Sequence, residues 1–452
     1  MPFDAAVPPQ PLNIAIVGTG IAGMSAAWLL SMSHSVTVYE KDRRMGGHSN
    51  TVEVSDSNSS IPVDTGFIVY NEANYPNLVA LFKHLGVPSK PSEMSFAASV
   101  DDGALEYSGS GLAGLFAQKS NILRPRFWRM LGDIWRFYRE GPAIMEMPGG
   151  DEESLGDYLD RQGYSHAFVY DHLLPMAAAI WSTAAHEMRD HPASAFIRFC
   201  SNHGLMQVAN RPQWRTVDGG SREYARRLTQ AYAGNIRVGS GVRCISRNGR
   251  DVIVEDQFGR IGAYDHIVIA THADQALAML SDPSADERKL LGTFGYSRNT
   301  AVLHQDPQLM PRRRNVWSSW NYLSRSGQDG ASRVCVTYWM NRLQGLVSTE
   351  PLLVTLNPNR DPDPRKILRT FEYEHPSFDI GAMNAQRRLW DLQGVRNTWF
   401  CGSYFGAGFH EDALQAGLAV AETLGGVRRP WTINGQSDRI HVPAPTRLEV
   451  AV

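Results

Sequence analysis

The stretch that decides the fold is Leu12-Asn-Ile-Ala-Ile-Val-Gly-Thr-Gly-Ile-Ala-Gly23, close to the start of the chain. Its first half, Leu12–Val17, is short, mostly apolar and rich in branched residues, which predicts a buried parallel strand. The Ala-rich segment Met24–Met32 then predicts a helix, and Val36–Glu40 predicts a second strand that ends in an acid. This order of strand, glycine turn, helix, strand and acid is typical of a Rossmann-like domain that binds a dinucleotide.

Each part of this motif has a mechanical role in such a domain. Gly18 allows the tight turn, Gly20 lets the backbone approach a pyrophosphate, and Gly23 lets the helix pack closely against the strand. The start of the helix offers free N–H groups and a positive dipole end to the phosphates. Glu40 is placed to accept hydrogen bonds from an adenosine ribose. The motif therefore predicts a dinucleotide cofactor.

Composition bounds what else the protein can be. The chain has 452 residues, which predicts more than one domain, and its net charge is −2. This balance excludes a generally basic nucleic-acid-binding protein. No apolar run approaches the ~20 residues that span a bilayer, and the first residues lack the features of a secretion signal. The four cysteines show no CxxC or zinc-ligand spacing, so we expect a cytoplasmic protein without a metal site.

A second glycine pair, Gly46-Gly47, follows soon after Glu40 within Lys41–His48. With this pair the sequence resembles the flavin-containing amine oxidase and phytoene desaturase superfamily, which carries an acid, a basic stretch and then Gly-Gly. The resemblance implies that the Gly-Gly backbone lies along the pyrophosphate and ribityl chain of FAD. The family usually has Arg after the pair, where this chain has His48.

The end of the chain carries the same resemblance. Within Trp399–Gly417 a strand ends at Gly402, a glycine-rich loop follows, and a helix begins near Asp412. The resemblance implies that this helix start faces the N1–C2=O edge of the flavin, which becomes anionic on reduction. Ser403 stands where the family usually has an acid that binds the ribityl hydroxyls. The cofactor residues that we expect are Gly18, Gly20, Ile21, Ala22, Gly23, Glu40, Lys41, Arg44, Gly46, Gly47, His48, Gly66, Val242, Ala270, Gly402, Ser403, Asp412 and Ala413.

These segments imply an α/β fold in which a Rossmann-like FAD-binding domain of the glutathione-reductase type is interleaved with an α+β substrate domain. We expect residues 12–70, 213–280 and 397–425 to form the FAD-binding domain. Residues 71–212 and 281–396 would form the substrate domain, and residues 426–452 a C-terminal tail.

One predicted helix outside the cofactor motifs, Leu123–Glu140, is amphipathic. Arginines fall on one face, and Pro125 suits the first helical turn. Such a helix can pack its aromatic face into a core, or it can lie in an anionic membrane interface. The residues on the predicted apolar face are Phe127, Met130, Leu131, Ile134, Trp135 and Tyr138.

Longer stretches, such as Val63–Asn77 and Arg211–Val217, resemble a bacterial family of amine-oxidase-like proteins that are described as NAD/FAD-binding and are associated with cyclopropane-fatty-acid-synthase-like methyltransferases. The resemblance implies a flavoenzyme of lipid metabolism, with desaturation of methyl-branched fatty acyl chains as the leading activity. It also implies a lipid-modifying enzyme as a partner, whereas the amphipathic segment Leu123–Glu140 is what suggests peripheral contact with the inner membrane. Two alternatives stay open: a flavin amine oxidase, and a non-catalytic FAD protein in a lipid-modifying complex.

The catalytic candidates lie just before the last flavin helix. Amine oxidases often have a Gly-Tyr pair there, and this chain has Gly408-Phe409, so the phenol is missing. An apolar wall of this kind favours hydride removal from a carbon chain to flavin N5 over amine chemistry. Tyr404 and His410 are the nearest polar candidates for the accompanying proton, and His410 is favoured because an ordinary histidine titrates near neutrality.

Overall fold

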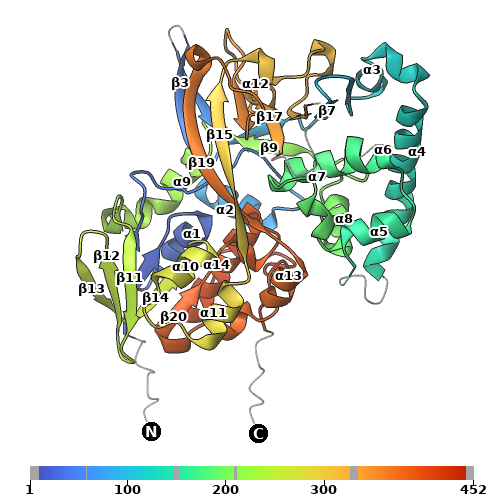
Figure 1. The fold of residues 1–452 in the computed structure, drawn as a ribbon. Helices are drawn as coiled ribbons and strands as arrows, with labels where there is room; N and C mark the ends of the chain where they lie inside the picture. The colour runs from blue at the N-terminus through green and yellow to red at the C-terminus, as the bar shows by residue number, and fades with distance from the viewer. Residues whose placement is uncertain (1–9, 57–58, 147–152, 208–210, 326–333, 444–452) are drawn as a thin grey trace. The chain divides into compact units, whose positions relative to one another are not determined.

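The computed structural model describes residues 10–56, 59–146, 153–207, 211–325 and 334–443 (Figure 1). Contacts divide the chain into two compact units. Unit 1 comprises the described parts of Met1–Gly47, Tyr224–Phe294 and Ala385–Val452, and unit 2 comprises those of His48–Glu223 and Gly295–Asn384. Both units are therefore built from segments that lie far apart in the sequence.

A five-stranded parallel sheet forms the centre of unit 1. The strand order is β10-β2-β1-β14-β20, with each neighbouring pair parallel. Ile14, Ala15 and Ile16 in β1 are fully buried, as expected for a strand covered on both faces. The strands are β1 (Asn13–Val17), β2 (Ser35–Tyr39), β10 (Ile236–Arg237), β14 (His266–Ile269) and β20 (Thr398–Phe400).

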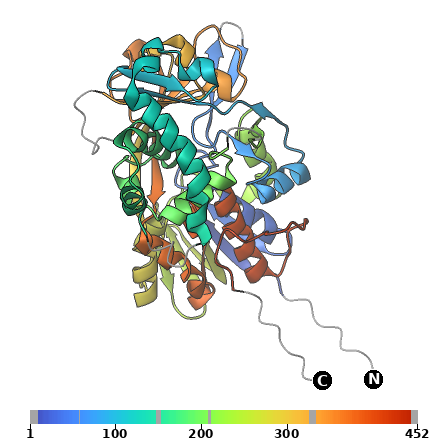
Figure 2. The ribbon, with the colours of Figure 1, turned by 90° about the vertical axis from the view of Figure 1, so that its right-hand side faces the viewer.

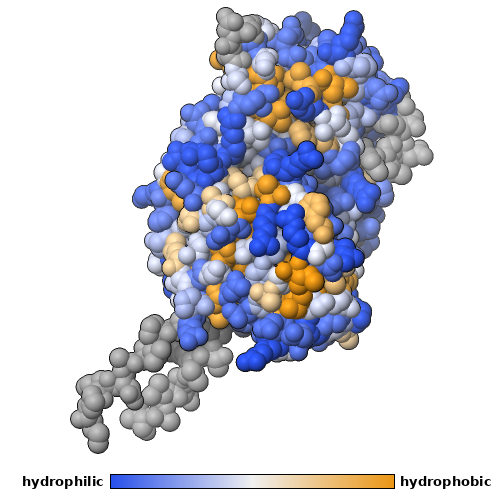
Figure 3. All heavy atoms as spheres, turned by 90° about the vertical axis from the view of Figure 1, so that its left-hand side faces the viewer, coloured by the Kyte–Doolittle hydropathy of each residue, from blue (hydrophilic) through white to orange (hydrophobic). Residues whose placement is uncertain are grey.

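Two long helices of unit 1, α1 (Ile21–Leu30) and α14 (His410–Gly425), pack against each other (Figure 1). A Cβ added at Gly417 would lie 2.3 Å from the carbonyl oxygen of Ala22, so glycine is required where the helices touch. An antiparallel sheet of β11 (Val242–Arg247), β12 (Val252–Asp256) and β13 (Ile261–Tyr264) adds a surface that mixes hydrophilic and hydrophobic residues (Figure 3). The further helices are α9 (Arg222–Thr229), α10 (Ala273–Met279), α11 (Ala285–Leu291) and α13 (Ile380–Gln386), of which α9 and α13 cross the unit boundaries.

A seven-stranded sheet forms the core of unit 2. Its order is β19-β15-β18-β17-β16-β7-β8, antiparallel except where β16 runs parallel to β7. Val336, Val354 and Leu303 lie in its buried apolar cluster. The strands are β7 (Phe96–Val100), β8 (Leu105–Ser108), β15 (Gly295–His304), β16 (Trp320–Leu323), β17 (Cys335–Trp339), β18 (Leu353–Leu356) and β19 (Ile367–Ser377).

Two small sheets and a group of helices complete unit 2. β3 (Thr51–Asp56) pairs with β4 (Ser59–Asp64), and β9 (Trp214–Val217) lies between β5 (Tyr70–Asn71) and β6 (Ser89–Ser92). A π-helical turn, Val169–Leu173, joins two of the helices. The helices are α2 (Pro76–Leu85), α3 (Leu112–Leu115), α4 (Pro125–Glu140), α5 (Leu155–Arg161), α6 (His166–Phe168), α7 (Leu174–Trp181), α8 (Ala193–Asn202) and α12 (Met340–Leu343).

The observed unit boundaries differ from the expected ones. Residues 48–70 and 213–223 belong to unit 2, because strand β5 pairs with β9 and β9 pairs with β6. Residues 281–294 and 385–396 belong to unit 1. Strand pairing between distant segments decides these boundaries, and motif spacing does not reveal it. The expected tail reaches residues 444–452, which lie outside the described residues, and its earlier part belongs to unit 1.

The amphipathic helix α4 buries most of the expected face, since Leu131 and Ile134 also pack against its core cluster, but Trp135 departs from that face. Phe127, Met130 and Phe137 are buried, whereas Trp135 is 63% exposed. Residues 127, 130 and 137 are separated by three and seven positions, so they share one face of the helix, and Trp135 lies to the side of that face. Within the described ranges, no helix combines the length and the apolar character needed to cross a bilayer.

Candidate functional site

The cofactor segments of unit 1 meet at one edge of its parallel sheet. Gly18 follows β1, Glu40 follows β2, Ala270 follows β14, and Gly402 comes just after β20. Because all these strands are parallel, their carboxyl ends lie at the same edge. The chain runs from β1 to β2 on one side, and β14 pairs with β1 on the other side. Dinucleotides bind at the carboxyl edge where a parallel sheet reverses its strand order in this way.

Two glycines of the first motif are required by packing. Gly18 has φ +100°, and a Cβ there would lie 2.9 Å from the carbonyl oxygen of Ala270. A Cβ at Gly23 would lie 2.0 Å from the carbonyl oxygen of Gly18. These glycines hold the start of α1 against β1 and β14, as the sequence motif predicts.

The middle glycine of the motif, Gly20, differs because packing does not require it to be a glycine. A Cβ built on Gly20 has no heavy atom within 4 Å, and its φ of −61° suits any residue. Gly47 lies beside it, since a Cβ on Gly47 would be 3.2 Å from the Cα of Gly20. The side chains of Ile21 and Ala22 are buried, and the open space lies at the start of α1, where an anion is favoured.

Glu40 is held in place by two backbone groups and a hydroxyl. Its Oε2 accepts from the Thr19 N–H at 3.0 Å and from the Thr19 hydroxyl. Its Oε1 accepts from the Asp42 N–H at 2.9 Å. A carboxylate has about four acceptor positions, so this one retains capacity for ribose hydroxyls. Thr19 also accepts from the Gly46 N–H at 3.2 Å; the sequence analysis missed this link between the two glycine motifs.

Lys41, Arg44 and Val242 are the other cofactor residues expected in this part of unit 1. Lys41 is exposed, and Gly241 packs against it, because a Cβ on Gly241 would be 3.1 Å from the Cβ of Lys41. Val242 begins β11 next to this turn. The guanidinium of Arg44 lies 3.5 Å from the carbonyl oxygen of its neighbour Met45.

Two expected cofactor residues, His48 and Gly66, belong to unit 2. A Cβ on Gly66 would lie 2.2 Å from the carbonyl oxygen of His48, which also accepts from the Phe67 N–H at 2.7 Å. The His48 ring lies 4.9 Å from the ring of Tyr373. Glycine is therefore required at position 66 by the chain's own backbone.

A side chain that the sequence did not predict, Gln386, supports the glycine-rich loop after β20. Gln386 donates from Nε2 to the carbonyl oxygens of Tyr404 and Gly406, at 2.9 and 2.6 Å. Tyr404 is 1% exposed, and its ring packs against Phe294 and Phe405. Ser403 precedes it in a short 3₁₀ turn. The Tyr404 ring is thus part of the packing of unit 1.

The start of α14 holds a buried carboxyl group of its own. Asp412 is fully buried, and its Oδ2 accepts from the Phe409 N–H at 2.7 Å. Its Oδ1 lies 3.1 Å from Nε of Arg439. Burial raises the pKa of Asp412, although Arg439 opposes the shift. The contacts expected between Asp412, Ala413 and a flavin stay predictions.

His410, the favoured proton carrier, has a strongly shifted pKa. Its Nε2 lies 3.0 Å from the hydroxyl of Tyr224. Burial lowers the pKa of His410 to about 3, and its place in the first turn of α14 also disfavours a positive charge. The expectation that this ring titrates near neutrality is therefore wrong, and at pH 7 the ring is neutral. Catalytic roles for His410, Tyr404 and Phe409 stay predictions.

Comparison with protein families gives one match that spans most of the chain. The model of the family described as "Flavin containing amine oxidoreductase" matches residues 21–424. The chain belongs to this family. Membership confirms the expected family and its flavin cofactor, FAD.

A curated relative and several solved structures also resemble this chain. A protein of Mycobacterium tuberculosis named "Putative flavin-containing monoamine oxidase AofH" is 25% identical over 289 residues, which are 61% of this chain and 60% of that protein. The chain therefore matches less than two thirds of this relative. A putrescine oxidase mutant superposes with a TM-score of 0.66 at 14% identity, covering 92% of this chain and 99% of the other. A fatty acid isomerase from P. acnes that produces CLA has a TM-score of 0.63 at 13% identity, covering 92% and 98%. These likenesses show the fold, and they confirm the α/β class.

The residues of unit 1 fit the FAD of this amine oxidoreductase family. The open space at Gly20 suits a pyrophosphate, the spare acceptor capacity of Glu40 suits a ribose, and the backbone of Gly46-Gly47 lies beside Gly20. FAD bound there supplies a hydride acceptor. The individual contacts expected for Lys41, Arg44, Val242 and Ser403 stay predictions.

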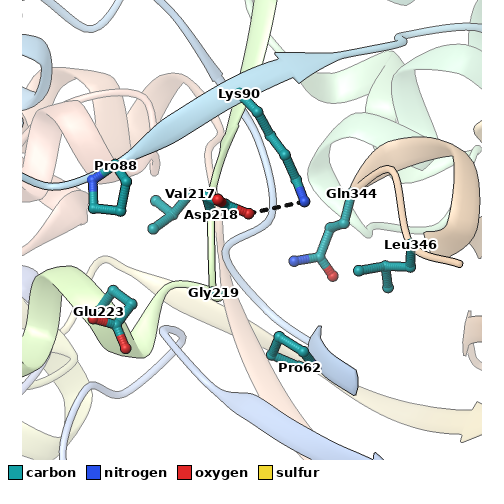
Figure 4. Close-up of a pocket in the computed structure, with 10 residues that line it drawn as sticks. Pro62, Pro88, Lys90, Val217, Asp218, Gly219, Glu223, Gln344 and Leu346 are labelled. Atoms are coloured by element: carbon teal, nitrogen blue, oxygen red, sulfur yellow. Dashed lines mark ion pairs between the residues drawn. The ribbon is translucent and has the colours of Figure 1, made fainter. Parts of the chain in front are cut away.

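Unit 2 contains an open pocket of about 360 Å³ that includes none of the expected site residues (Figure 4). Lys90 and Asp218 form a 3.0 Å ion pair at this pocket, and Gln344 lines it. Gln344 also donates at 2.8 Å to the buried Asp64, which accepts from the Ser221 N–H at 2.9 Å. Burial raises the pKa of Asp64 to about 6. This network ties the Val217–Ser221 turn to the end of β4, and it has a positioning role.

Proposed function

We propose that this protein is an FAD-dependent oxidoreductase that removes a hydride from the carbon chain of a fatty acyl lipid, most specifically a methyl-branched one, and so acts as a desaturase. The observation that carries the proposal is the apolar character of the chain just before α14. Phe409 stands at the N-cap of the helix, where an amine oxidase often carries a tyrosine, and His410 beside it is uncharged at pH 7.

The segment before α14, residues 402–410, supplies apolar side chains against which an alkyl chain could pack. Phe409 presents a ring without a hydroxyl, and Tyr404 and Phe405 are packed beneath the loop. Glu411, the first acid after this segment, is fully buried. Its carboxylate accepts from the Gln415 side chain at 3.1 Å, which is a hydrogen bond within α14. Residues 402–410 therefore bring no carboxylate that would favour an ammonium group.

The neutral state of His410 limits its ability to accept the proton that leaves the substrate. A ring with a pKa near 3 is a weak base at pH 7. The ring can orient the Tyr224 hydroxyl, which lies 3.0 Å from its Nε2. His410 and Tyr224 together then act as a neutral polar pair beside Phe409, and the proton released with the hydride passes to solvent water and not to a charged imidazolium.

Amine oxidation is the second candidate. The family description and the naming of the M. tuberculosis relative support it, whereas the P. acnes fatty acid isomerase, which shares the fold, supports the lipid proposal. A third arrangement, a non-catalytic FAD protein beside a lipid-modifying methyltransferase, predicts that neither substrate class reduces the flavin.

Anaerobic mixing of the purified holoenzyme with substrates separates these candidates. The lipid proposal expects methyl-branched phospholipid acyl chains to reduce the flavin, seen as loss of the oxidised absorbance, and primary amines to leave it oxidised. The variant Phe409→Tyr restores the usual residue of the amine oxidases and should shift reduction toward amines. Phe258→Tyr, an exposed position in the same unit, is the matched control. Reduction of the parent by amines alone would overturn the lipid proposal, and reduction by neither class would favour the non-catalytic arrangement.

A further inference from the structure

One surface of unit 2 exposes more apolar side chain than its surroundings. We call it the Trp ridge; it lies on α3, the following 3₁₀ turn (Lys119–Leu123) and α4, and α4 faces the viewer in Figure 2. Its residues are Leu112, Ile122, Leu123, Trp128 and Trp135, with exposed fractions of 75%, 51%, 85%, 51% and 63%. Trp128 and Trp135 are the exposed tryptophans among the residues that the structure describes. Large apolar side chains that stand together in water mark an interaction surface.

The two tryptophans of the ridge lie on one side of α4. Trp128 and Trp135 are seven residues apart, so they project from the same side of the helix. The face that unit 2 needs is a different one, because Phe127 and Met130 pack into a cluster with Ala98 and Tyr107. The core therefore does not explain the two tryptophans.

Local contacts hold the ridge in its exposed conformation. The indole N–H of Trp128 donates to the carbonyl oxygen of Ile122 at 2.8 Å. The ring of Trp128 also lies 5.6 Å from the ring of Phe116. Because the one polar atom of this indole is bonded within the chain, its exposed part offers water an apolar face.

The segment of chain that carries most of the ridge has more cations than acids. From Lys119 to Trp135 the chain carries four cations and one acid, Asp133. The carboxylate of Asp133 accepts from the Ser165 N–H at 2.9 Å and lies 3.6 Å from Arg136, so it is turned to the protein. The cations are Lys119, Arg124, Arg126 and Arg129.

These cations are not equivalent. Arg126 bonds both oxygens of Asp171, at 2.7 and 2.8 Å, and Arg124 donates to the carbonyl oxygen of Ala104 at 2.7 Å. Lys119 and Arg129 are exposed at either side of the ridge residues Ile122 and Leu123 in the sequence. These two residues are the ones best placed to meet an external anion.

We propose that the Trp ridge docks unit 2 on the surface of an anionic lipid bilayer. Tryptophan and leucine side chains enter the boundary between headgroups and acyl chains, and flanking lysine and arginine contact anionic headgroups. The basic residues are few beside the clusters of about 4–8 that bind anionic lipid strongly. Docking is therefore weak, reversible and reduced by salt. This proposal does not depend on which substrate the flavin oxidises.

Flotation of the full-length holoprotein with vesicles tests this docking. The vesicles contain phosphatidylcholine with about one third phosphatidylglycerol, and vesicles of phosphatidylcholine alone serve as the comparison. The double variant Leu123→Gln/Trp135→Gln removes two apolar ridge side chains whose exposure makes misfolding improbable. We expect its bound fraction at limiting lipid to fall on the order of tenfold, because less apolar surface enters the interface. Lys119→Gln/Arg129→Gln should lower binding to the anionic vesicles and leave the weak binding to phosphatidylcholine unchanged.

The matched control is Val347→Gln, since Val347 is 91% exposed and lies in the same unit outside the ridge. It should float like the parent. FAD content and the thermal unfolding midpoint confirm that each variant is folded. Equal flotation of the parent and the double ridge variant would overturn the proposal, as would a parent that stays unbound. A parent that dimerises in sedimentation experiments through the ridge but ignores vesicles would assign the surface to a second copy of this chain. Flavin reduction by soluble substrates without vesicles is a separate readout, so failure of docking and failure of the proposed reaction are distinguishable.

Discussion

The two helices that begin at the carboxyl edge of the unit 1 sheet, α1 and α14, look alike in sequence but differ in charge. Each follows a strand and a glycine-rich turn. The first turn of α1 has no acid, and the space at Gly20 is open. The first turn of α14 holds Glu411 and Asp412, both fully buried. A free helix start attracts an anion, whereas an internal carboxylate neutralises part of the dipole. The same local pattern thus gives α1 a phosphate-binding end and gives α14 an end that the protein itself has capped.

Gly20→Val is the strongest test of the α1 end. A Cβ at this position has no heavy atom within 4 Å, so the fold should survive, but the valine side chain fills the space for the pyrophosphate and should lower FAD affinity by about 100-fold or more. FAD titration of the apoprotein measures this loss. Gly295→Val is the matched control, because its added side chain also meets open space. Unchanged FAD affinity in Gly20→Val would show that the phosphates bind elsewhere.

Gly417→Ala tests whether the two helices depend on each other. The added Cβ would lie 2.3 Å from the Ala22 carbonyl oxygen, so α14 must move away from α1, and the free energy of unfolding should fall by about 1–3 kcal/mol. Denaturant unfolding measures it. Gly132→Ala in α4 is the control; its Cβ meets nothing within 4 Å, and the exchange should stabilise by about 0.5–1 kcal/mol. Equal stability of the two variants would contradict the close packing.

His410→Gln tests the pKa at the α14 end. Because the folded-state pKa is about 3 and the unfolded one is about 6.5, the unfolded chain takes up a proton first as the pH falls. Protonation therefore lowers the stability of the parent below pH 6.5, by up to about 2 kcal/mol at pH 5, and this loss should be absent in His410→Gln. Unfolding curves across this pH range measure it, with the exposed His84→Gln as control. The same pH dependence in the parent and in His410→Gln would show that the ring titrates normally.

Asp412→Asn probes the smallest difference, the carboxylate that distinguishes the α14 end from the α1 end. Asparagine can still accept from the Phe409 N–H, and Arg439 then adds an uncompensated positive charge. A helix-end charge contributes about 0.3–1 kcal/mol, so the potential of a nearby flavin should rise by about 20 mV at most for a two-electron couple. Redox titration measures it, and Asp274→Asn at the start of α10 is the control. An unchanged potential would show that the α14 end does not face the flavin.

Much of the cofactor segment could be predicted from the sequence. The strands and helix around Gly18–Gly23 and the acid at Glu40 lie where the motif places them, because this turn is fixed by backbone contacts only a few residues apart. The helix after Gly408 was also expected, although it begins at His410, before Asp412. The supporting residues Thr19 and Gln386 were missed. A hydroxyl beside the first glycine was the only available signal for Thr19, and Gln386 had none.

The sequence by itself determined the fold class, the flavin family and the positions of the glycine turns, because these depend on local backbone geometry and on residues that cannot carry a side chain. Only the tertiary structure decided the charge states of buried groups and the ion-pair partners of the site residues. Burial lowers the pKa of His410, and the fold places Arg439 next to Asp412. The pairing of β5 with β9 places residues 48–70 in unit 2. It also decided that Trp135 faces solvent while Phe137 is buried. Periodicity places a side chain on a helix face, but the neighbouring elements determine which face meets the core.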